Sequence, residues 1–411
     1  MRLGSANTYD NALQNLYTRQ SELSSQQEKL TSGKNINRPS DDPTGAGQAE
    51  RALTRITRVA TDQRALEVQR NSITLSESTL GDANSLVQNI RDLVVSAGNA
   101  TLSATDRASK AQEMQGLRDQ LFTLANKTDS NGIPLFGGLG SASAPFTDAS
   151  SGVAFNGVGG QRASTETTLP GAMDGQAIWM NVPTGNGTFN VALGTGATLP
   201  TTNTGTLSTD AGVVVPPAAA GNYSVKFTVT GVTTTYNILD STGAVILPAP
   251  VIAPAVAAAA PIYVAGQSIQ IPGSGMSFVA SGAPATGDVV QISPSTKTNI
   301  FKVLDDAIAG IKSSGTADVN QTIPLALTQI DAGMNKISAA RGQAGNWLNR
   351  ADNITSSQQS RTIQLTADKS RAEDLDMVKG ISDFQKAQTG YQAALQSYAQ
   401  VQKLSLFNYI S

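Results

Sequence analysis

The sequence has no cysteine and no histidine among its 411 residues. Without thiols or imidazoles the chain cannot form a disulfide, use a cysteine nucleophile or a histidine base, or hold zinc through its usual ligands. Most common enzyme mechanisms therefore lose their central residue. We expect no enzymatic activity, no cofactor and no metal site.

Charge and long apolar runs are also scarce. The formal net charge is −2, which gives no basic surface for nucleic acid, and no run of eighteen apolar residues is present that could span a membrane. Polar residues interrupt every turn from Asn7 to Gln27, so we expect no classical signal peptide. Neither nucleic-acid binding nor membrane insertion is expected, and composition leaves the compartment open.

Both ends of the chain carry apolar residues that recur in alternating steps of three and four. Such a stripe is narrower than the apolar face of a globular helix and is typical of a coiled coil. Glutamines occupy some positions of the stripe, where a polar residue weakens the seam but selects register and partner. The predicted assembly seam consists of Leu13, Leu16, Gln20, Leu23, Gln27, Leu30, Met377, Ile381, Phe384, Gln388, Tyr391, Leu395, Tyr398 and Leu404. An ordinary monomeric bundle would show the same periodicity and stays open as an alternative.

Helical patterns also fill the chain between these ends and its middle. We expect helices over residues 8–32, from Pro43 to about 98, from about 104 to 127, over 300–311, and from 323 to about 374. Gly33 favours a helix end, and Pro43 is suited to a first helical position. The predicted helix-junction caps are Asp41, Asp42, Pro43, Asp374 and Asp376. Paired acids could instead bind a metal or share a proton, but their places at helix junctions favour capping.

The middle of the chain has a different composition. Residues 139–296 contain eight charged residues and thirteen of the seventeen prolines. Residues 223–229 and 232–238 alternate apolar and polar side chains on either side of Gly231, which predicts a hairpin. We expect shorter strands at 177–182, 188–193, 262–264, 268–271 and 289–292, and a loop or irregular edge strand at 251–260.

These patterns predict a mainly α fold with an inserted all-β domain. Both chain ends would form a long, antiparallel, coiled-coil-like helical rod, with the β domain at its tip. We expect terminal helices over 1–42 and 375–411, a rod domain over 43–138 and 299–374, and the β insert over 139–298.

Two long motifs carry a family resemblance. Residues 23–49 read LSSQQEKLTSGKNINRPSDDPTGAGQA, and residues 370–411 read SRAEDLDMVKGISDFQKAQTGYQAALQSYAQVQKLSLFNYIS. Together they resemble the two halves of the signature of flagellin-like axial proteins of the bacterial flagellum. The segment RGQAGNWLNRADN at 341–353 is similar to one that this family carries at the same place. The resemblance covers about 250 residues.

Further motifs resemble the branch of that family that joins the hook to the filament. They are SDDP at 40–43, LFGG at 135–138, SGAPATGD at 281–288 and the ending with LSL at 404–406. Flagellins more often carry Ala-Ala-Gly where this chain has Pro43, Thr44 and Gly45, and they usually end in a Leu-Leu-Arg type tail. Ile133 and Pro134 depart from the Arg-Tyr that is common before Leu-Phe in the junction branch.

The resemblance implies a structural protein that is exported unfolded through the flagellar type III apparatus, with a flagellar export chaperone as partner. It would form a ring of identical copies at the hook–filament junction, outside the cell, between the first junction protein and flagellin. The terminal helices would form an inner tube, and the β domain would face outward.

Three other functions remain as alternatives to a junction protein. Flagellin itself, the filament subunit, would share the coiled terminal helices. A secreted adhesin or binding module would place its function in the β insert, which the few charges there argue against. An enzyme would have to use Asp, Glu or Lys as its base.

Overall fold

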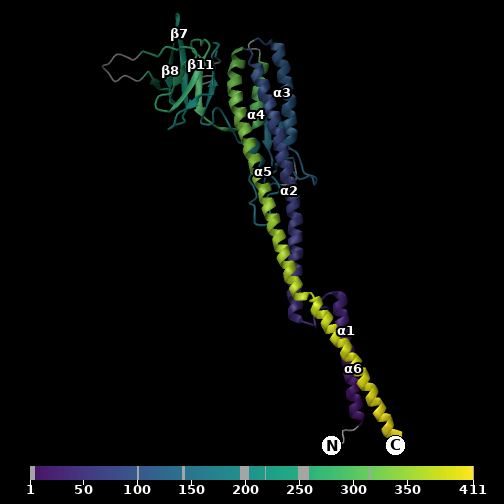
Figure 1. Ribbon diagram of the computed structural model, residues 1–411. Helices are drawn as coiled ribbons and strands as arrows, with labels where there is room; N and C mark the ends of the chain where they lie inside the picture. Colours follow the sequence, from purple (N-terminus) through teal and green to yellow (C-terminus); the bar gives the residue numbers. More distant parts are fainter. Residues whose placement is uncertain are drawn as a thin grey trace. The chain divides into compact units, whose positions relative to one another are not determined.

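The computed structural model describes residues 5–99, 101–140, 144–194, 203–217, 219–248, 259–313 and 316–410. Helices dominate both ends of the chain, and strands fill its middle (Figure 1). The α-helices of the described part are α1 Ser5–Ser32, α2 Pro43–Ala97, α3 Ala104–Ala125, α4 Ile300–Lys312, α5 Thr316–Glu373 and α6 Met377–Ile410. The fold is therefore mainly α with an all-β middle, as the sequence predicts.

The chain forms two compact units. The first unit comprises Met1–Ala65 and Asp352–Ser411, and the second comprises Leu66–Ala351. Both boundaries fall inside long helices, one within α2 and the other within α5. We call them the terminal unit and the central unit.

In the terminal unit, α1 and α6 lie side by side and run antiparallel (Figure 1). Leu30 lies beside Gly380, and Arg19 lies beside Gly390, so residue numbers rise on one helix as they fall on the other. Gly33 ends α1 with a φ of 70°, a conformation that glycine adopts without the steric cost of a Cβ. The predicted helix end at Gly33 is confirmed.

In the central unit, parts of α2 and α5 pack along a seven-residue repeat. Leu66, Ile73, Leu80, Val87 and Val94 of α2 are at most 2% exposed, as their predicted spacing requires. The α5 residues that recur at the same interval are equally buried; they are Ile330, Ile337, Ala344 and Ala351. Two ion pairs, Arg91 to Asp331 at 2.7 Å and Arg341 to Glu77 at 2.6 Å, show that the two helices run antiparallel.

Helices α3 and α4 complete the helical part of the central unit. Ser103 caps α3 in a capping box, because its hydroxyl accepts from the Asp106 amide and the Asp106 carboxylate accepts from the Ser103 amide. Asn299 caps α4 by accepting from the Lys302 amide at 2.6 Å. The predicted starts of both helices are confirmed to within about a residue.

The middle of the chain contains two larger antiparallel sheets. The first has five strands in the order β4 Phe189–Leu193, β12 Val289–Pro294, β7 Tyr223–Thr230, β8 Thr233–Leu239 and β9 Val245–Leu247. The second orders β10 Ser268–Gln270, β11 Met276–Ser281 and β5 Ser208–Thr209, with β6 Val213–Val214 also paired to β11. Two-stranded pairs are formed by β1 Phe146–Ala149 with β2 Gly152–Phe155 and by β3 Val182–Pro183 with β13 Lys297–Thr298. The predicted hairpin at Gly231 is confirmed as β7 and β8.

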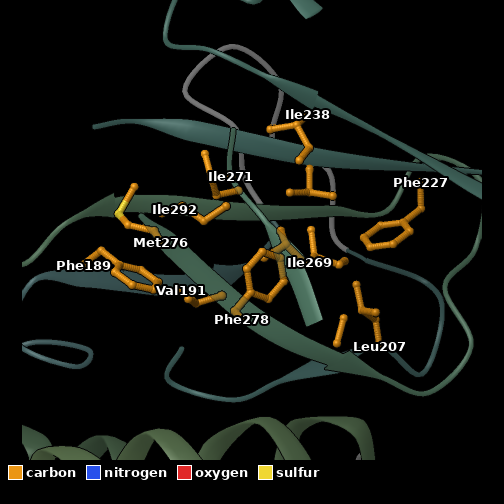
Figure 2. Packing of buried hydrophobic residues seen from close by; sticks show 13 residues of the cluster. Phe189, Val191, Leu207, Phe227, Ile238, Ile269, Ile271, Met276, Phe278 and Ile292 are labelled. Atoms are coloured by element: carbon orange, nitrogen blue, oxygen red, sulfur yellow. The ribbon is translucent and has the colours of Figure 1, made fainter. Parts of the chain in front are cut away.

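The two larger sheets share one hydrophobic core (Figure 2). Phe189, Phe227 and Ile292 from the first sheet pack with Met276 and Phe278 from the second, and all are at most 1% exposed. The β insert is also attached to α5, because Gln321 accepts from the Thr209 amide at 2.6 Å and donates to its hydroxyl at 2.9 Å.

Two of the predicted short strands are wrong. Residues 176–180 form a π-helix, η1 Gln176–Met180, in which the adjacent Ile178 and Trp179 are both buried. A strand turns neighbouring side chains to opposite faces, so it could not bury both against one layer. Residues 262–264 form only an isolated bridge from Ile262 to Thr235. Most of the predicted loop at 251–260 lies outside the described residues.

Candidate functional site

The surface that the sequence singles out is the pair formed by α1 and α6. On α1, the four predicted leucines, Leu13, Leu16, Leu23 and Leu30, are all partly buried. Gln20 and Gln27 are exposed, and Gln26 is partly buried in place of Gln27. The leucines of the predicted stripe thus face α6, whereas its glutamines lie on the solvent side of the pair.

On α6, the buried stripe is rotated from the predicted one. Phe384, Tyr391 and Tyr398 are partly buried, as the seam requires. The positions between them are filled by small residues, Gly380, Ala387 and Ala394, which are also buried or partly buried. A Cβ added to Gly380 would lie 3.3 Å from Leu30, so α1 and α6 approach each other closely there. The recurrence of small residues every seven positions was the sequence signal that could have located this face.

The remaining seam positions of α6 form an exposed stripe. Met377, Ile381 and Leu395 are 48, 47 and 41% exposed, and Gln388 lies among them in solvent. Leu404 lies on α6, but its side chain is outside the part of the chain that the structure describes. In a single chain, α6 therefore presents two stripes, one covered by α1 and one that includes apolar side chains left in water.

The connector after α1 and the connector before α6 pair with each other in a short antiparallel β-bridge between Lys34 and Asp374. The Asn35 amide donates to the Glu373 carbonyl at 2.8 Å, and the Leu375 amide donates to the Gly33 carbonyl at 2.9 Å. Lys34 forms a close ion pair with Glu373, and that hydrogen bond raises the pKa of Lys34. The bridge holds the two helix junctions together. No pattern in the sequence predicts this ion pair.

The predicted caps divide into two kinds. Asp42 accepts from the Thr44 amide at 2.9 Å, and Asp376 accepts from the amides of Val378 and Lys379 at 3.0 and 3.1 Å, so both occupy N-cap positions. Pro43 is the first residue of α2. These three lie where the sequence places them.

Asp41 and Asp374 do not cap a helix N-terminus. Asp41 accepts from the amides of Asn37 and Arg38 at 3.1 and 2.9 Å, which folds the connector before α2 and lowers the pKa of Asp41. Asp374 follows the end of α5 and accepts from the Ser370 hydroxyl. The N-cap positions directly before Pro43 and Met377 are occupied by Asp42 and Asp376. Asp41 and Asp374 instead form hydrogen bonds within the connectors.

Arg118 on α3 is a further buried group, and no motif in the sequence marks it. Its side chain is 5% exposed and pairs with Asp305 of α4 at 2.9 Å and with Asp148 of β1. The guanidinium also lies 5.6 Å from the centroid of the Phe301 ring. Hydrogen bonds to the two carboxylates raise the pKa of Arg118 although burial opposes this. The cluster ties three elements together.

Neither a metal site nor a membrane-spanning helix emerges within the described ranges. Among those residues, no three acidic side chains converge as metal ligands would. No helix there is long and apolar enough to cross a bilayer. The terminal unit offers contact surfaces, and its geometry suits protein association.

Known proteins with similar sequences are components of the bacterial flagellum. Models of the bacterial flagellin N-terminal and C-terminal helical regions match residues 5–141 and 327–410. Flagellar hook-associated protein 3 of Escherichia coli is 25% identical over 99% of this chain and 99% of its own length. The chain belongs to the flagellar hook-associated protein 3 family. The protein of that name from Salmonella typhimurium is 35% identical, over 40% of this chain and about half (51%) of its own length.

Solved structures of this family are also similar. The crystal structure of hook-associated protein 3 from Legionella pneumophila matches with a TM-score of 0.69 and 28% identity, covering 77% of this chain and 97% of that one. The Xanthomonas campestris FlgL structure matches with a TM-score of 0.65 and 29% identity, covering 77% and 98%. The relatives are flagellar components, and the predicted resemblance is confirmed at the level of this family.

Proposed function

We propose that this chain is a structural subunit of the bacterial flagellum that forms the junction between hook and filament and permits filament assembly. The observation that carries the proposal is the match to a hook-associated protein 3 over 99% of both chains. A flagellin of Clostridium tyrobutyricum aligns with only 34% of this chain, which favours the junction over the filament as the place of this protein.

We propose a separate role for each of the three segments expected from the sequence. Residues 1–42 and 375–411 would make the contacts within the axial tube, through the seam and the exposed stripe of α6. Residues 43–138 and 299–374 would form the surrounding wall, and residues 139–298 would face outward. Apolar side chains that remain in water, such as Ile381 at 47% exposure, support a role for the first segment in association.

The proposed partners are other flagellar proteins. Identical copies would associate in a ring, with the first hook–filament junction protein on one side and flagellin on the other. An export chaperone would hold the chain before its secretion through the flagellar type III apparatus. The unequal axial neighbours fit a subunit that does not stack on itself indefinitely.

A deletion strain tests the proposal. We expect such cells to build hooks without attached filaments and to release flagellin into the medium, as seen by electron microscopy and immunoblotting. Supplying the intact chain from a plasmid should restore filaments. Normal filaments in the deletion strain would contradict the proposal, and so would long filaments grown from the purified chain alone.

A further inference from the structure

The sequence contains three Asn-Gly pairs, at 131–132, 156–157 and 186–187. In such a pair, the backbone nitrogen of the glycine can attack the side-chain carboxamide of the asparagine, because glycine has no Cβ that hinders the approach. The attack requires an asparagine side chain that is free to turn and a glycine backbone that is free to rotate. The structure restrains the three pairs to different degrees.

Asn186 is fixed by its side chain. Its Oδ1 accepts from the amides of Thr188 and Phe189, both at 3.0 Å. Its Nδ2 donates to the Gly212 carbonyl at 3.1 Å. The amide of the following Gly187 is also hydrogen-bonded, at 3.2 Å. Four hydrogen bonds would have to break before the side chain and the glycine nitrogen could meet.

Asn156 is restrained in another way. Its Nδ2 donates to the Thr147 hydroxyl at 3.0 Å. The Gly157 amide has no hydrogen bond within the described part of the chain. Gly157 is closely packed, however, because an added Cβ would lie 2.5 Å from the Phe155 ring and 2.9 Å from the Gly137 carbonyl oxygen. Rotation of the backbone at this pair is therefore hindered.

Asn131 has the greatest freedom of the three. It is exposed, and its side chain forms no hydrogen bond within the described ranges. Gly132 is exposed as well, with a φ of 77°, and a Cβ added there would meet no atom within 4 Å beyond its chain neighbours. The reacting nitrogen is restrained by a hydrogen bond from the Gly132 amide to the Asp129 carbonyl at 3.1 Å. A hydrogen bond in an exposed turn opens at little cost, because few other contacts break with it.

We propose that Asn131 is a site of spontaneous deamidation in the folded chain. The Gly132 nitrogen loses its proton and bonds to Cγ of Asn131, and the side-chain nitrogen takes up that proton and leaves as ammonia. Water then opens the resulting five-membered succinimide at either carbonyl, which gives aspartate or isoaspartate at this position. The reaction uses the chain itself and water, so the site does not depend on the proposed function.

Either product would disturb the turn. Oδ1 of Asp129 accepts from the amides of Asn131 and Ile133 at 2.8 and 2.9 Å, and a new carboxylate at position 131 would place a like charge beside it. Isoaspartate would also lengthen the backbone by one CH₂ group. The turn leads into Leu135 and Phe136, which are both fully buried. We therefore expect the modified chain to protect the Ile133 amide less well from hydrogen exchange.

Incubation of the purified full chain in mildly alkaline water enriched in oxygen-18 tests the proposal. Each deamidation incorporates one heavy oxygen, digestion with pepsin in acid stops the reaction, and electron-transfer fragmentation in the mass spectrometer locates the label. Every site is compared in the folded chain and in the urea-unfolded chain, so that effects of the neighbouring sequence cancel. Asn131 should react within about threefold of its unfolded rate, whereas Asn186 should be slowed at least about tenfold and Asn156 should lie between them. Slowing of Asn131 as strong as that of Asn186, or stronger than that of Asn156, would overturn the proposal.

Two matched variants check which group reacts. Asn131→Gln would have to close a six-membered ring, which forms more slowly than the five-membered one. Oxygen-18 uptake in the peptide around position 131 should therefore be lost in this variant. Asn156→Gln is the control and should leave the uptake at Asn131 unchanged. Uptake that persists around position 131 in Asn131→Gln would show that another group reacts and would overturn the assignment.

Discussion

The β insert and the α1–α6 pair bury their apolar side chains to very different degrees. Phe227 and Phe278 in the insert are at most 1% exposed, whereas Met377 and Ile381 on α6 are nearly half exposed. Every side chain of the insert core is at most 3% exposed within the single chain (Figure 2). The insert completes its hydrophobic core within one molecule, and the terminal pair does not.

This difference in burial implies that the β insert is stable by itself, whereas the α1–α6 pair is stabilised by assembly. Ordering the backbone costs about 1 to 2 kcal/mol of conformational entropy per residue. The seam side chains of the helix pair are only partly buried, so their hydrophobic contribution offsets little of this cost. The missing stabilisation must come from other subunits if the pair is to be firmly held. We therefore expect the insert to be stable in isolated molecules and the terminal pair to depend on neighbours.

The largest expected effect is in the insert core. Phe227→Ala should destabilise the β insert by about 3 to 5 kcal/mol, because it removes a fully buried ring and leaves a cavity. Urea unfolding of the purified chain, followed by proton NMR of the insert, measures this change. The matched control, Val232→Ala, alters a fully exposed side chain of the β7–β8 turn and should change stability by less than about 0.5 kcal/mol. An equal loss in both variants would contradict the contrast.

A smaller loss is expected at the buried arginine of α3. Arg118→Leu should cost about 2 kcal/mol, less than a fully buried pair, because the Asp148 and Asp305 side chains are 37 and 38% exposed and stay hydrated. Arg341→Leu, which breaks the more exposed pair with Glu77, should cost at most about 1 kcal/mol. Thermal unfolding of the two variants compares them. A larger loss from Arg341→Leu would refute this ranking.

The exposed stripe of α6 should behave in the opposite way. Replacing Met377, Ile381 and Leu395 by serine should change monomer stability by less than about 0.5 kcal/mol per site, since each is at least 41% exposed. The same variant should fail to restore filaments in the deletion strain, because its contact surface is lost. Val232→Ser serves as the matched control and should restore them. Full complementation by the triple variant would show that the stripe plays no part in assembly.

The seam glutamines should also act only between molecules. Gln20 and Gln388 are exposed, so changing both to leucine should leave the monomer nearly as stable as before. In cells we expect aggregates or mis-stacked assemblies, because the polar groups that select register are gone. Gln88→Leu, an exposed change on α2, controls for added hydrophobicity. Normal motility with unchanged assembly in the double variant would remove the idea.

The smallest effect concerns pH and the connector before α2. Backbone hydrogen bonds from Arg38 and Asn37 lower the pKa of Asp41. A lowered folded pKa means that the carboxylate contributes stability above its usual pKa of about 3.9, and this contribution is lost as the pH falls through the folded value. The protection of the Asn37 and Arg38 amides, measured as their exchange rate relative to the intrinsic rate at each pH, should therefore fall in acid. In Asp41→Asn this protection should be lower at neutral pH and less sensitive to acid; unchanged protection would count against the role of Asp41.

Local signals in the sequence were enough to predict most of the helices and one hairpin. Gly33 and Pro43 mark helix ends through backbone geometry alone, and the alternation around Gly231 fixes the β7–β8 hairpin. The covered face of α6 was missed because the stripe was chosen by its largest apolar residues. In the structure, Gly380 and Ala387 let α1 approach most closely, so small side chains decide which face pairs.

Contacts between distant segments could not be predicted from the sequence. Arg118 meets carboxylates that follow it by 30 and 187 residues, and no local pattern links them. The π-helix at Trp179 likewise depends on an aromatic cluster with Phe136 and Phe301, which come from separate parts of the chain. In both cases tertiary packing decides the local structure.

Amide hydrogen exchange of the dilute monomer tests the contrast most directly. Backbone amides of β7, β8 and β12 should exchange slowly, with protection close to that of global unfolding of the insert, because their core is complete. Amides of α1 between Leu13 and Leu30, and of α6 between Met377 and Tyr398, should exchange fast in the monomer and become protected in isolated flagella. Equally strong protection of both regions in the monomer would contradict the account, because it would show that the terminal pair is stable without neighbouring subunits.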